Sequence, residues 1–468
     1  MRRWVAGLLA LVLVAGCGRP DGLARGLSGP TEEPRPGAEG AGDDYFPAMG
    51  NGGYDVRRYT LRLRYDPGTD VLSGRATVEA TATHSLSRFN LDFAGLEISA
   101  VTVAGVAATF QWDGGRELVV TPAAPVRSGQ VFRVEVTYSG RPAGEFRHTP
   151  DGALAVGEPE SASDWYPVNE HPSDKAAYDF EITVPAGLTV IANGVPGGSQ
   201  PADDGWQTVR WTASTPMAAY LSTLAIGRFR VFEETYEGRP VYSAIDERVP
   251  AGGGAERALR RTAEVTAYLA TRFGPYPFEA LGGVITAEEL GFALETQTRP
   301  VYEASFFNGE LRDATSIVAH ELAHQWFGDS VSVERWRDIW LNEGFATYAQ
   351  WLWEEHDGGP TAQEAFDDTF RTPAHANIWG PPPGDPSARG MFSGSVYVRG
   401  AMTVHALRLT IGDDAFFRLL PEWTASQGGG TGTTAEFIDL AERISGKQLD
   451  DFFQTWLYTD TKPSYPGR

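Results

Sequence analysis

A change of periodicity near residue 250 constrains the fold of this chain more than any other feature of its sequence. Before it, side chains alternate between apolar and polar, as in Arg75–Thr81 and Val131–Tyr138. This alternation is typical of strands with one packed and one solvated face, so we expect a mostly antiparallel β domain from Tyr54 to about Val231. After it, apolar residues recur at helical spacing. The pattern therefore predicts a multidomain α+β protein.

The second half predicts a mainly helical domain with a small sheet. Its first helix should end before Gly274-Pro275-Tyr276-Pro277, because proline cannot continue a helix. We divide the chain into a β domain over residues 46–235 and a second domain over residues 236–468. The expected helices span residues 255–273, 313–327, 343–355, 398–409, 413–426 and 434–458.

The N-terminus predicts export and a lipid anchor. Arg2 and Arg3 precede a short apolar stretch from Val5 to Val14, and a membrane-spanning helix needs roughly 20 apolar residues. Residues 1–17 therefore read as a signal peptide. Small residues before Cys17, the only cysteine, resemble the lipobox of bacterial lipoproteins, in which this cysteine would be acylated. The alternative is an ordinary signal peptide with an incidental cysteine.

Residues 18–45 are rich in Gly, Pro, Glu and Asp. Such a stretch buries little apolar surface, so we expect a flexible linker between the lipid and the folded domains. The protein should then be exported and held at the cell membrane, in the cell envelope.

The charge balance excludes one class of partner. The chain has 39 basic and 61 acidic side chains, a formal charge of −22. A nucleic-acid-binding protein needs a basic surface, so nucleic acid is not expected as a partner. An acidic surface is compatible with substrates that carry a positive end. No obligate protein partner is evident.

The motif His320-Glu321-Leu322-Ala323-His324 predicts a metal site. On a helix, residues four apart lie on one face, so both imidazoles can bind one ion. Catalytic zinc takes three protein ligands and keeps one open position. Glu343, at the start of the next expected helix, is a suitable third ligand. Glu321 lies beside the ion without binding it and can take a proton from the attacking water.

These residues belong to a wider resemblance. The segments around the motif are similar to those of the aminopeptidase N family of zinc metallopeptidases. The resemblance extends from about residue 50 to the end, over His320–Asp329, Trp340–Ala346, Trp165–Ala176, Phe273–Pro277 and Val396–Ala401. It implies a saddle-like β domain followed by a thermolysin-like catalytic domain, one zinc ion per chain, and peptide substrates with a free N-terminus.

The resemblance also implies roles for three further residues. Tyr397 would donate a hydrogen bond to the oxyanion that forms during hydrolysis. Glu295 and Glu158 would bind the ammonium group of the substrate. The family's exopeptidase signature is Gly-x-Met-Glu-Asn, and here the matching segment is Phe292-Ala293-Leu294-Glu295-Thr296, which keeps only the glutamate.

Other functions remain open on the same residues. The scaffold could support an epoxide hydrolase or an endopeptidase of thermolysin type, although Glu295 argues against the endopeptidase. A non-catalytic envelope binding protein would be expected to lack a ligand or the base, and none of these residues is missing. The chain ends soon after Leu457, so we expect the cleft to be more open than in larger relatives.

Overall fold

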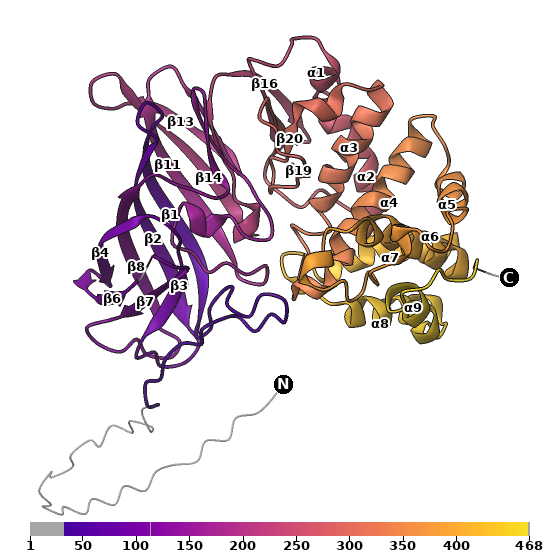
Figure 1. Cartoon of the computed structure of the whole chain (residues 1–468), viewed down its shortest axis with the longest axis horizontal. Helices are drawn as coiled ribbons and strands as arrows, with labels where there is room; N and C mark the ends of the chain where they lie inside the picture. Colours follow the sequence, from indigo (N-terminus) through magenta and orange to yellow (C-terminus); the bar gives the residue numbers. More distant parts are fainter. Residues whose placement is uncertain (1–31, 113, 467–468) are drawn as a thin grey trace, which may run out of the picture. The chain divides into compact units, whose positions relative to one another are not determined.

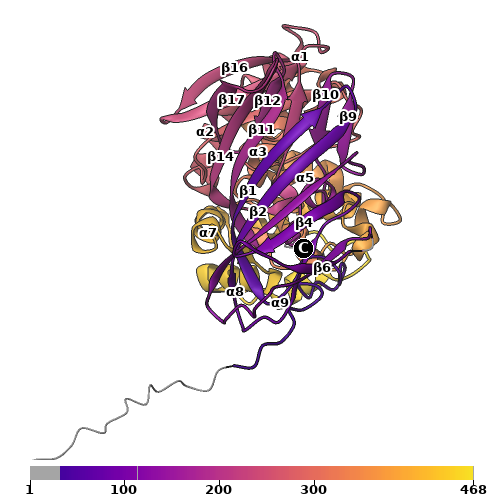
Figure 2. The same cartoon turned by 90° about the vertical axis from the view of Figure 1, so that its left-hand side faces the viewer.

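Alternating side chains build sheets in the first half of the chain. In the computed structural model, which describes residues 32–112 and 114–466, β1 (Tyr54–Asp66) and β2 (Val71–Ala82) bury every second side chain along most of their length. They form the centre of an eight-stranded sheet with the order β13-β14-β11-β1-β2-β8-β4-β5. Every neighbouring pair in this sheet is antiparallel except β1 and β11, which run side by side in Figure 2.

Two smaller sheets complete the β domain, shown in indigo to magenta in Figure 1. Their orders are β12-β15-β10-β9 and β3-β7-β6. The remaining strands of the domain are β3 (Phe89–Asp92), β4 (Glu97–Val103), β5 (Val106–Ala107), β6 (Thr109–Gln111), β7 (Glu117–Thr121), β8 (Val131–Gly140), β9 (Phe146–Thr149), β10 (Gly152–Ala155), β11 (Lys175–Pro185), β12 (Thr189–Ala192), β13 (Val195–Pro201), β14 (Trp206–Ala218) and β15 (Leu224–Gly227).

The second domain contains a five-stranded sheet with the order β16-β17-β18-β20-β19. The first strand of this sheet, β16 (Phe229–Tyr236), pairs with β17 and so belongs to the second domain, although our boundary at residues 235 and 236 leaves most of it in the first. Strand pattern alone does not reveal which sheet a strand joins. The strands are β16 (Phe229–Tyr236), β17 (Arg239–Asp246), β18 (Leu281–Thr286), β19 (Ala293–Leu294) and β20 (Val301–Glu303).

Two helices, α1 and α2, lie between β17 and β18, and the other helices follow the sheet, coloured orange to yellow in Figure 1. No helix in the described part of the chain is both long enough and apolar enough to cross a membrane. The helices are α1 (Gly254–Leu259), α2 (Thr262–Phe273), α3 (Leu311–His324), α4 (Trp340–His356), α5 (Ala362–Phe370), α6 (Gly400–Ile411), α7 (Asp413–Ser426), α8 (Thr434–Ser445) and α9 (Asp450–Leu457).

The observed helices differ from the expected ones in three places. The helix expected over residues 255–273 is two helices, α1 and α2. The helix expected over residues 434–458 is also two, because Gly446 adopts the left-handed conformation and ends α8. The helix α5 was not expected, although Thr361 and Glu364 form a capping box that marks its start.

The last part of the expected linker is attached to the folded unit. The described residues from Pro34 onward form one compact unit. Arg35 forms a β-bridge with Leu86, and Asp43 Oδ2 accepts a 2.8 Å hydrogen bond from the Trp336 N–H. Residues 34–45 are therefore not a free linker, because their polar groups find partners that a composition-based argument overlooks. The signal peptide and Cys17 lie outside the described residues.

Candidate metal centre and substrate cavity

Two adjacent helices bring three potential metal ligands together. His320 and His324 lie one turn apart near the end of α3, and Glu343 lies in the first turn of α4. Glu343 Oε2 is 3.2 Å from His320 Nε2 and 3.4 Å from His324 Nε2. One ligand atom from each residue lies within 4.8 Å of the other two. The three predicted ligands thus converge on one point.

The outer atoms of both imidazoles are held by hydrogen bonds. His324 Nδ1 is 3.0 Å from the Phe327 carbonyl oxygen, which can only accept, so Nδ1 carries the proton. His320 Nδ1 lies 2.9 Å from Gln350 Oε1 in the same way. Both Nε2 atoms are therefore left as lone-pair donors. Burial raises the pKa of Glu343, but His324 and His320 outweigh it and hold the pKa at about 2, so this carboxylate is ionised. Two imidazoles and a carboxylate are a donor set that suits catalytic zinc.

Glu321 lies beside the ligands. It is buried on α3, and one of its oxygens lies within 4.8 Å of ligand atoms of His324 and Glu295. Burial raises the pKa of Glu321 to about 7, although His320 and His324 oppose the shift. A carboxylate with such a pKa can both accept and release a proton near neutral pH.

A cavity of about 570 Å³ opens over these residues. Its wall combines the metal ligands, Glu321 and the acids predicted to bind an amine with several apolar side chains. The lining residues are Glu158, Gly291, Phe292, Ala293, Leu294, Glu295, Phe306, Ile317, His320, Glu321, His324, Glu343, Gln350, Phe392 and Tyr397.

Glu158 and Glu295 meet in this cavity although they lie on different domains. Oxygen atoms of Glu158, Glu295 and Glu343 lie within 4.8 Å of one another. The Oε1 atoms of Glu158 and Glu295 are buried, and neither has a hydrogen-bond partner in the described part of the chain. Burial raises the pKa of both carboxyl groups. Buried carboxylate oxygens without hydrogen-bond partners are expensive to maintain unless a cation joins them.

A polar turn holds Glu295 despite its altered signature. Thr296, where the family has asparagine, donates its hydroxyl to the Arg299 carbonyl at 2.6 Å. Gln325 Nε2 donates to the Glu295 carbonyl at 2.9 Å, and its Oε1 accepts from the Thr298 N–H at 2.8 Å. Thr298 has a φ of 67°, a strained conformation that these bonds maintain. The turn is therefore specified by contacts other than the family's asparagine.

Tyr397 lies beside His320. It belongs to a π-helical turn over Ser395–Arg399 that precedes α6. Its ring is nearly parallel to the His320 imidazole, with an interplanar angle of 15° and a centroid distance of 6.0 Å. The side chain lines the cavity.

The structure adds residues that the sequence analysis did not identify. Gln350 contacts His320, and Gln325 supports Glu295. Gln350 lies seven residues after Glu343 on α4, so helical periodicity could have placed both on one face. Gln325 follows His324 directly, but no pattern indicates its partners. Phe392 also lines the cavity and carries no recognisable motif, whereas Phe292 lines it from the segment that matches the exopeptidase signature.

Comparison with known proteins covers both domains. Residues 56–221 match the family model of the peptidase M1 N-terminal domain, and residues 283–456 match that of the peptidase family M1 domain. A structure of an M1 zinc metallopeptidase from Deinococcus radiodurans, a glutamate-to-alanine mutant bound to a Tyr-Ser-Ala substrate, is 30% identical. That likeness covers 91% of this chain and 99% of the other, with a TM-score of 0.82.

Longer aminopeptidases are also similar. Mouse glutamyl aminopeptidase is 27% identical over 64% of this chain and 33% of its own length. Aminopeptidase M1-D from rice (Oryza sativa subsp. japonica) is 25% identical over 88% of this chain and 50% of its own length. The chain thus spans a third to a half of the length of these curated relatives. The predicted fold, a β-rich domain followed by a helical metallopeptidase domain, is confirmed. The chain belongs to peptidase family M1, the aminopeptidase N family of zinc metallopeptidases.

Proposed function

We propose that this protein is a zinc aminopeptidase that hydrolyses the first peptide bond of substrates with a free N-terminus. The observation that carries the proposal is a pair of acids, the half-buried Glu158 and the buried Glu295, that line the same cavity as the three metal ligands. Their Oε1 atoms lack hydrogen-bond partners. Among the described residues, no arginine or lysine lines this cavity. The site is therefore suited to a substrate ammonium group.

The metal ligands in this scheme are His320, His324 and Glu343, which would hold one zinc ion. A zinc ion bound in this way lowers the pKa of a water molecule to around 7 and polarises the scissile carbonyl. Glu321 accepts a proton from the attacking water and passes it to the leaving amine. Its raised pKa, about 7, suits both transfers.

Tyr397, whose ring lies beside that of His320, acts on the scissile carbonyl. Its hydroxyl donates a hydrogen bond to the oxygen of the scissile carbonyl as negative charge develops there. The side chain is half-buried, and burial raises the pKa of its phenol well above the usual value, so the proton is retained for donation.

Glu158 and Glu295 determine which bond is cleaved. An ammonium group between them is held a fixed distance from the metal ligands, so only the first peptide bond reaches the site of attack. A peptide with a blocked N-terminus would leave both carboxylates without a partner, and sites built on such pairing reject these analogues by roughly 10⁴-fold. An endopeptidase on the same scaffold would show no such selectivity.

The decisive experiment compares free and N-acetylated peptides. The wild type should cleave the free peptide with a kcat/KM roughly 10⁴-fold higher. Glu295→Ala should lower activity on the free peptide and narrow this ratio. Glu289→Ala, at an exposed acid of the same segment, is the matched control and should leave the ratio unchanged. Similar kcat/KM for both peptides in the wild type would make the protein an endopeptidase.

We also propose that the protein is exported and anchored to the cell membrane through a lipid on Cys17. The support is the sequence around Cys17, with a basic start, a short apolar stretch and small residues before the cysteine. Wild-type protein should carry the lipid and remain in the membrane fraction, and Cys17→Ser should carry none. A soluble wild-type protein whose N-terminus follows another residue would refute the anchor.

A further inference from the structure

Glu158 lies on a loop of the β domain, and the loop residues before and after it make specific contacts within that domain. The loop joins β10 to β11 and includes a short 3-10 helix, η1 (Ala162–Asp164). No motif of Glu158 itself fixes its direction toward the cavity. The contacts on both sides of it do so instead.

On one side, the loop is closed against Glu145. The Val156 N–H donates to the Glu145 carbonyl at 3.2 Å, and the Glu145 N–H donates to Asp164 Oδ2 at 2.8 Å. A Cβ atom added to Gly157 would lie 2.5 Å from Cγ of Glu145, so the Gly157 backbone packs directly on that side chain. Gly157, the residue before Glu158, is therefore closely packed against Glu145.

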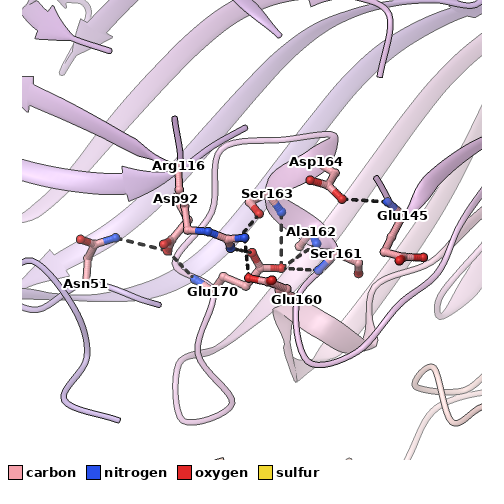
Figure 3. A network of polar contacts seen from close by, with 10 residues as sticks. All are labelled: Asn51, Asp92, Arg116, Glu145, Glu160, Ser161, Ala162, Ser163, Asp164 and Glu170. Carbon is pink, nitrogen blue, oxygen red and sulfur yellow. Dashed lines mark hydrogen bonds and ion pairs between the residues drawn. The ribbon is translucent and has the colours of Figure 1, made fainter. Parts of the chain in front are cut away.

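On the other side of Glu158, the buried carboxylate of Glu170 accepts hydrogen bonds from several backbone N–H groups of the loop (Figure 3). Glu170 Oε1 accepts from the N–H groups of Ser161 and Ala162, each at 2.7 Å, and more weakly from Ser163 at 3.4 Å. Ser161 does not cap η1 with its own side chain. Glu170, nine residues after Ser161 on the same loop, supplies that acceptor, and only 1% of its side chain is exposed.

Arg116 joins this carboxylate to the loop's side chains. Its guanidinium donates to Glu170 Oε2 at 3.2 Å and to the Ser163 hydroxyl at 3.3 Å, and it pairs with Glu160. The Glu170 N–H donates to Asp92 Oδ2 at 2.9 Å, which anchors the carboxylate to β3. Every loop residue from Glu160 to Asp164 thus has a specific contact, and two residues separate this group from Gly157.

We infer that Glu170 and Arg116 are positioning residues for substrate selection, acting through the loop that presents Glu158 to the N-terminal ammonium group. The inference rests on the proposed function, since it concerns the same amine site. A misplacement of about 1 Å can cost as much as 10²-fold in an assembled site. Loosening this loop should therefore weaken recognition of the free amine, with the zinc ligands and Glu321 unaffected because they lie on other elements.

The test measures binding rather than turnover. Zinc-loaded protein carrying Glu321→Gln, which removes the base, is titrated in a calorimeter with Tyr-Ser-Ala and with acetyl-Tyr-Ser-Ala. Added Glu170→Gln should raise the Kd of Tyr-Ser-Ala about 10-fold or more, and that of the acetylated peptide less than about 2-fold. The glutamine amide has only one acceptor oxygen where the carboxylate has two. It therefore loses the hydrogen bonds from either the backbone N–H groups or Arg116.

Two further variants provide a second test of the inference and a matched control. Arg116→Gln should behave like Glu170→Gln, and it carries the test if Glu170→Gln does not fold. Glu117→Gln replaces a partly buried carboxylate next to Arg116 whose oxygens accept no hydrogen bond from the described residues of the loop, and it should bind both peptides normally.

The final arm repeats Glu170→Gln in a Glu158→Ala background, where it should change the Kd of Tyr-Ser-Ala less than about 2-fold. An undiminished effect there, or equal weakening for both peptides, would make Glu170 a residue of general stability and overturn the inference. If Glu158→Ala alone leaves binding unchanged, the amine-binding role of Glu158 in the proposed function fails instead. If Glu158→Ala weakens binding and neither Glu170→Gln nor Arg116→Gln does, the positioning role alone is refuted.

Discussion

His320 Nδ1 lies 2.9 Å from Gln350 Oε1, so a glutamine on α4 orients a metal ligand on α3. Gln350 Nε2 in turn lies 3.4 Å from the Ser316 hydroxyl, which donates to Glu354 at 2.6 Å. The glutamine is thereby fixed with its oxygen toward the imidazole. The two helices that carry the ligands are also joined by this chain of polar contacts.

Replacing Gln350 with alanine should weaken zinc binding about 10–100-fold, because the His320 ring loses the contact that sets its orientation and tautomer. Competition with a chelator of known affinity measures the change. Gln454→Ala, at an exposed residue of α9, should bind zinc as the wild type does. Unchanged zinc affinity in Gln350→Ala would show that His320 is oriented by packing alone.

Replacing Glu321 with glutamine should preserve zinc and lower kcat by at least about 10²–10⁴-fold, because only the proton acceptor is lost. Metal analysis and steady-state kinetics on one preparation separate the two effects. Glu343→Gln is the contrasting variant and should lose zinc together with activity. Loss of zinc from Glu321→Gln would make Glu321 a ligand.

Tyr397→Phe should lower kcat by about 10²-fold and change KM much less, because the hydroxyl is needed mainly when charge develops on the carbonyl oxygen. Tyr268→Phe removes a hydroxyl bonded to the Leu352 carbonyl at 2.8 Å, away from the cavity, and should leave kcat unchanged. A normal kcat in Tyr397→Phe would assign Tyr397 a packing role.

Gln325→Ala should retain zinc yet reduce discrimination between free and acetylated peptides, since the Glu295 carbonyl and the Thr298 N–H both lose their partner. Each unpaired buried group also costs about 1–3 kcal/mol of stability. Thr424→Val, which removes a buried hydroxyl bond to the Phe273 carbonyl, controls for that loss. Equal discrimination in Gln325→Ala and the wild type would contradict the role of this turn.

His405 should make the protein acid-sensitive. Burial lowers the pKa of this histidine from 6.5 to about 4. Between these values the unfolded chain binds a proton that the folded protein does not, so stability falls as the pH drops from 6.5 toward 4 and changes little below. The shift corresponds to roughly 3 kcal/mol.

His405→Gln cannot take up this proton, so its unfolding free energy should depend less on pH over that interval. Denaturant titrations of both proteins at several pH values give the comparison. Parallel curves for wild type and variant would show that His405 does not contribute.

The sequence by itself determined the features that depend on local spacing. His320 and His324 are four residues apart, and a helix of regular pitch necessarily puts both imidazoles on one face. The alternation in β2 and β8 likewise identified strands before any partner strand was known. The family motifs added the fold and the candidate roles of Tyr397, Glu295 and Glu158.

Contacts between distant segments were decided only in the tertiary structure. The meeting of Glu158 with Glu295, the bond from Gln350 to His320 and the contact of Arg116 with Glu170 each join residues on separate elements. Residues 34–45 look like a linker by composition but are bound by partners such as Trp336, nearly 300 positions away. Periodicity reports how a segment turns about its own axis. It carries no information on which buried polar group will face which, because that follows from how the elements pack.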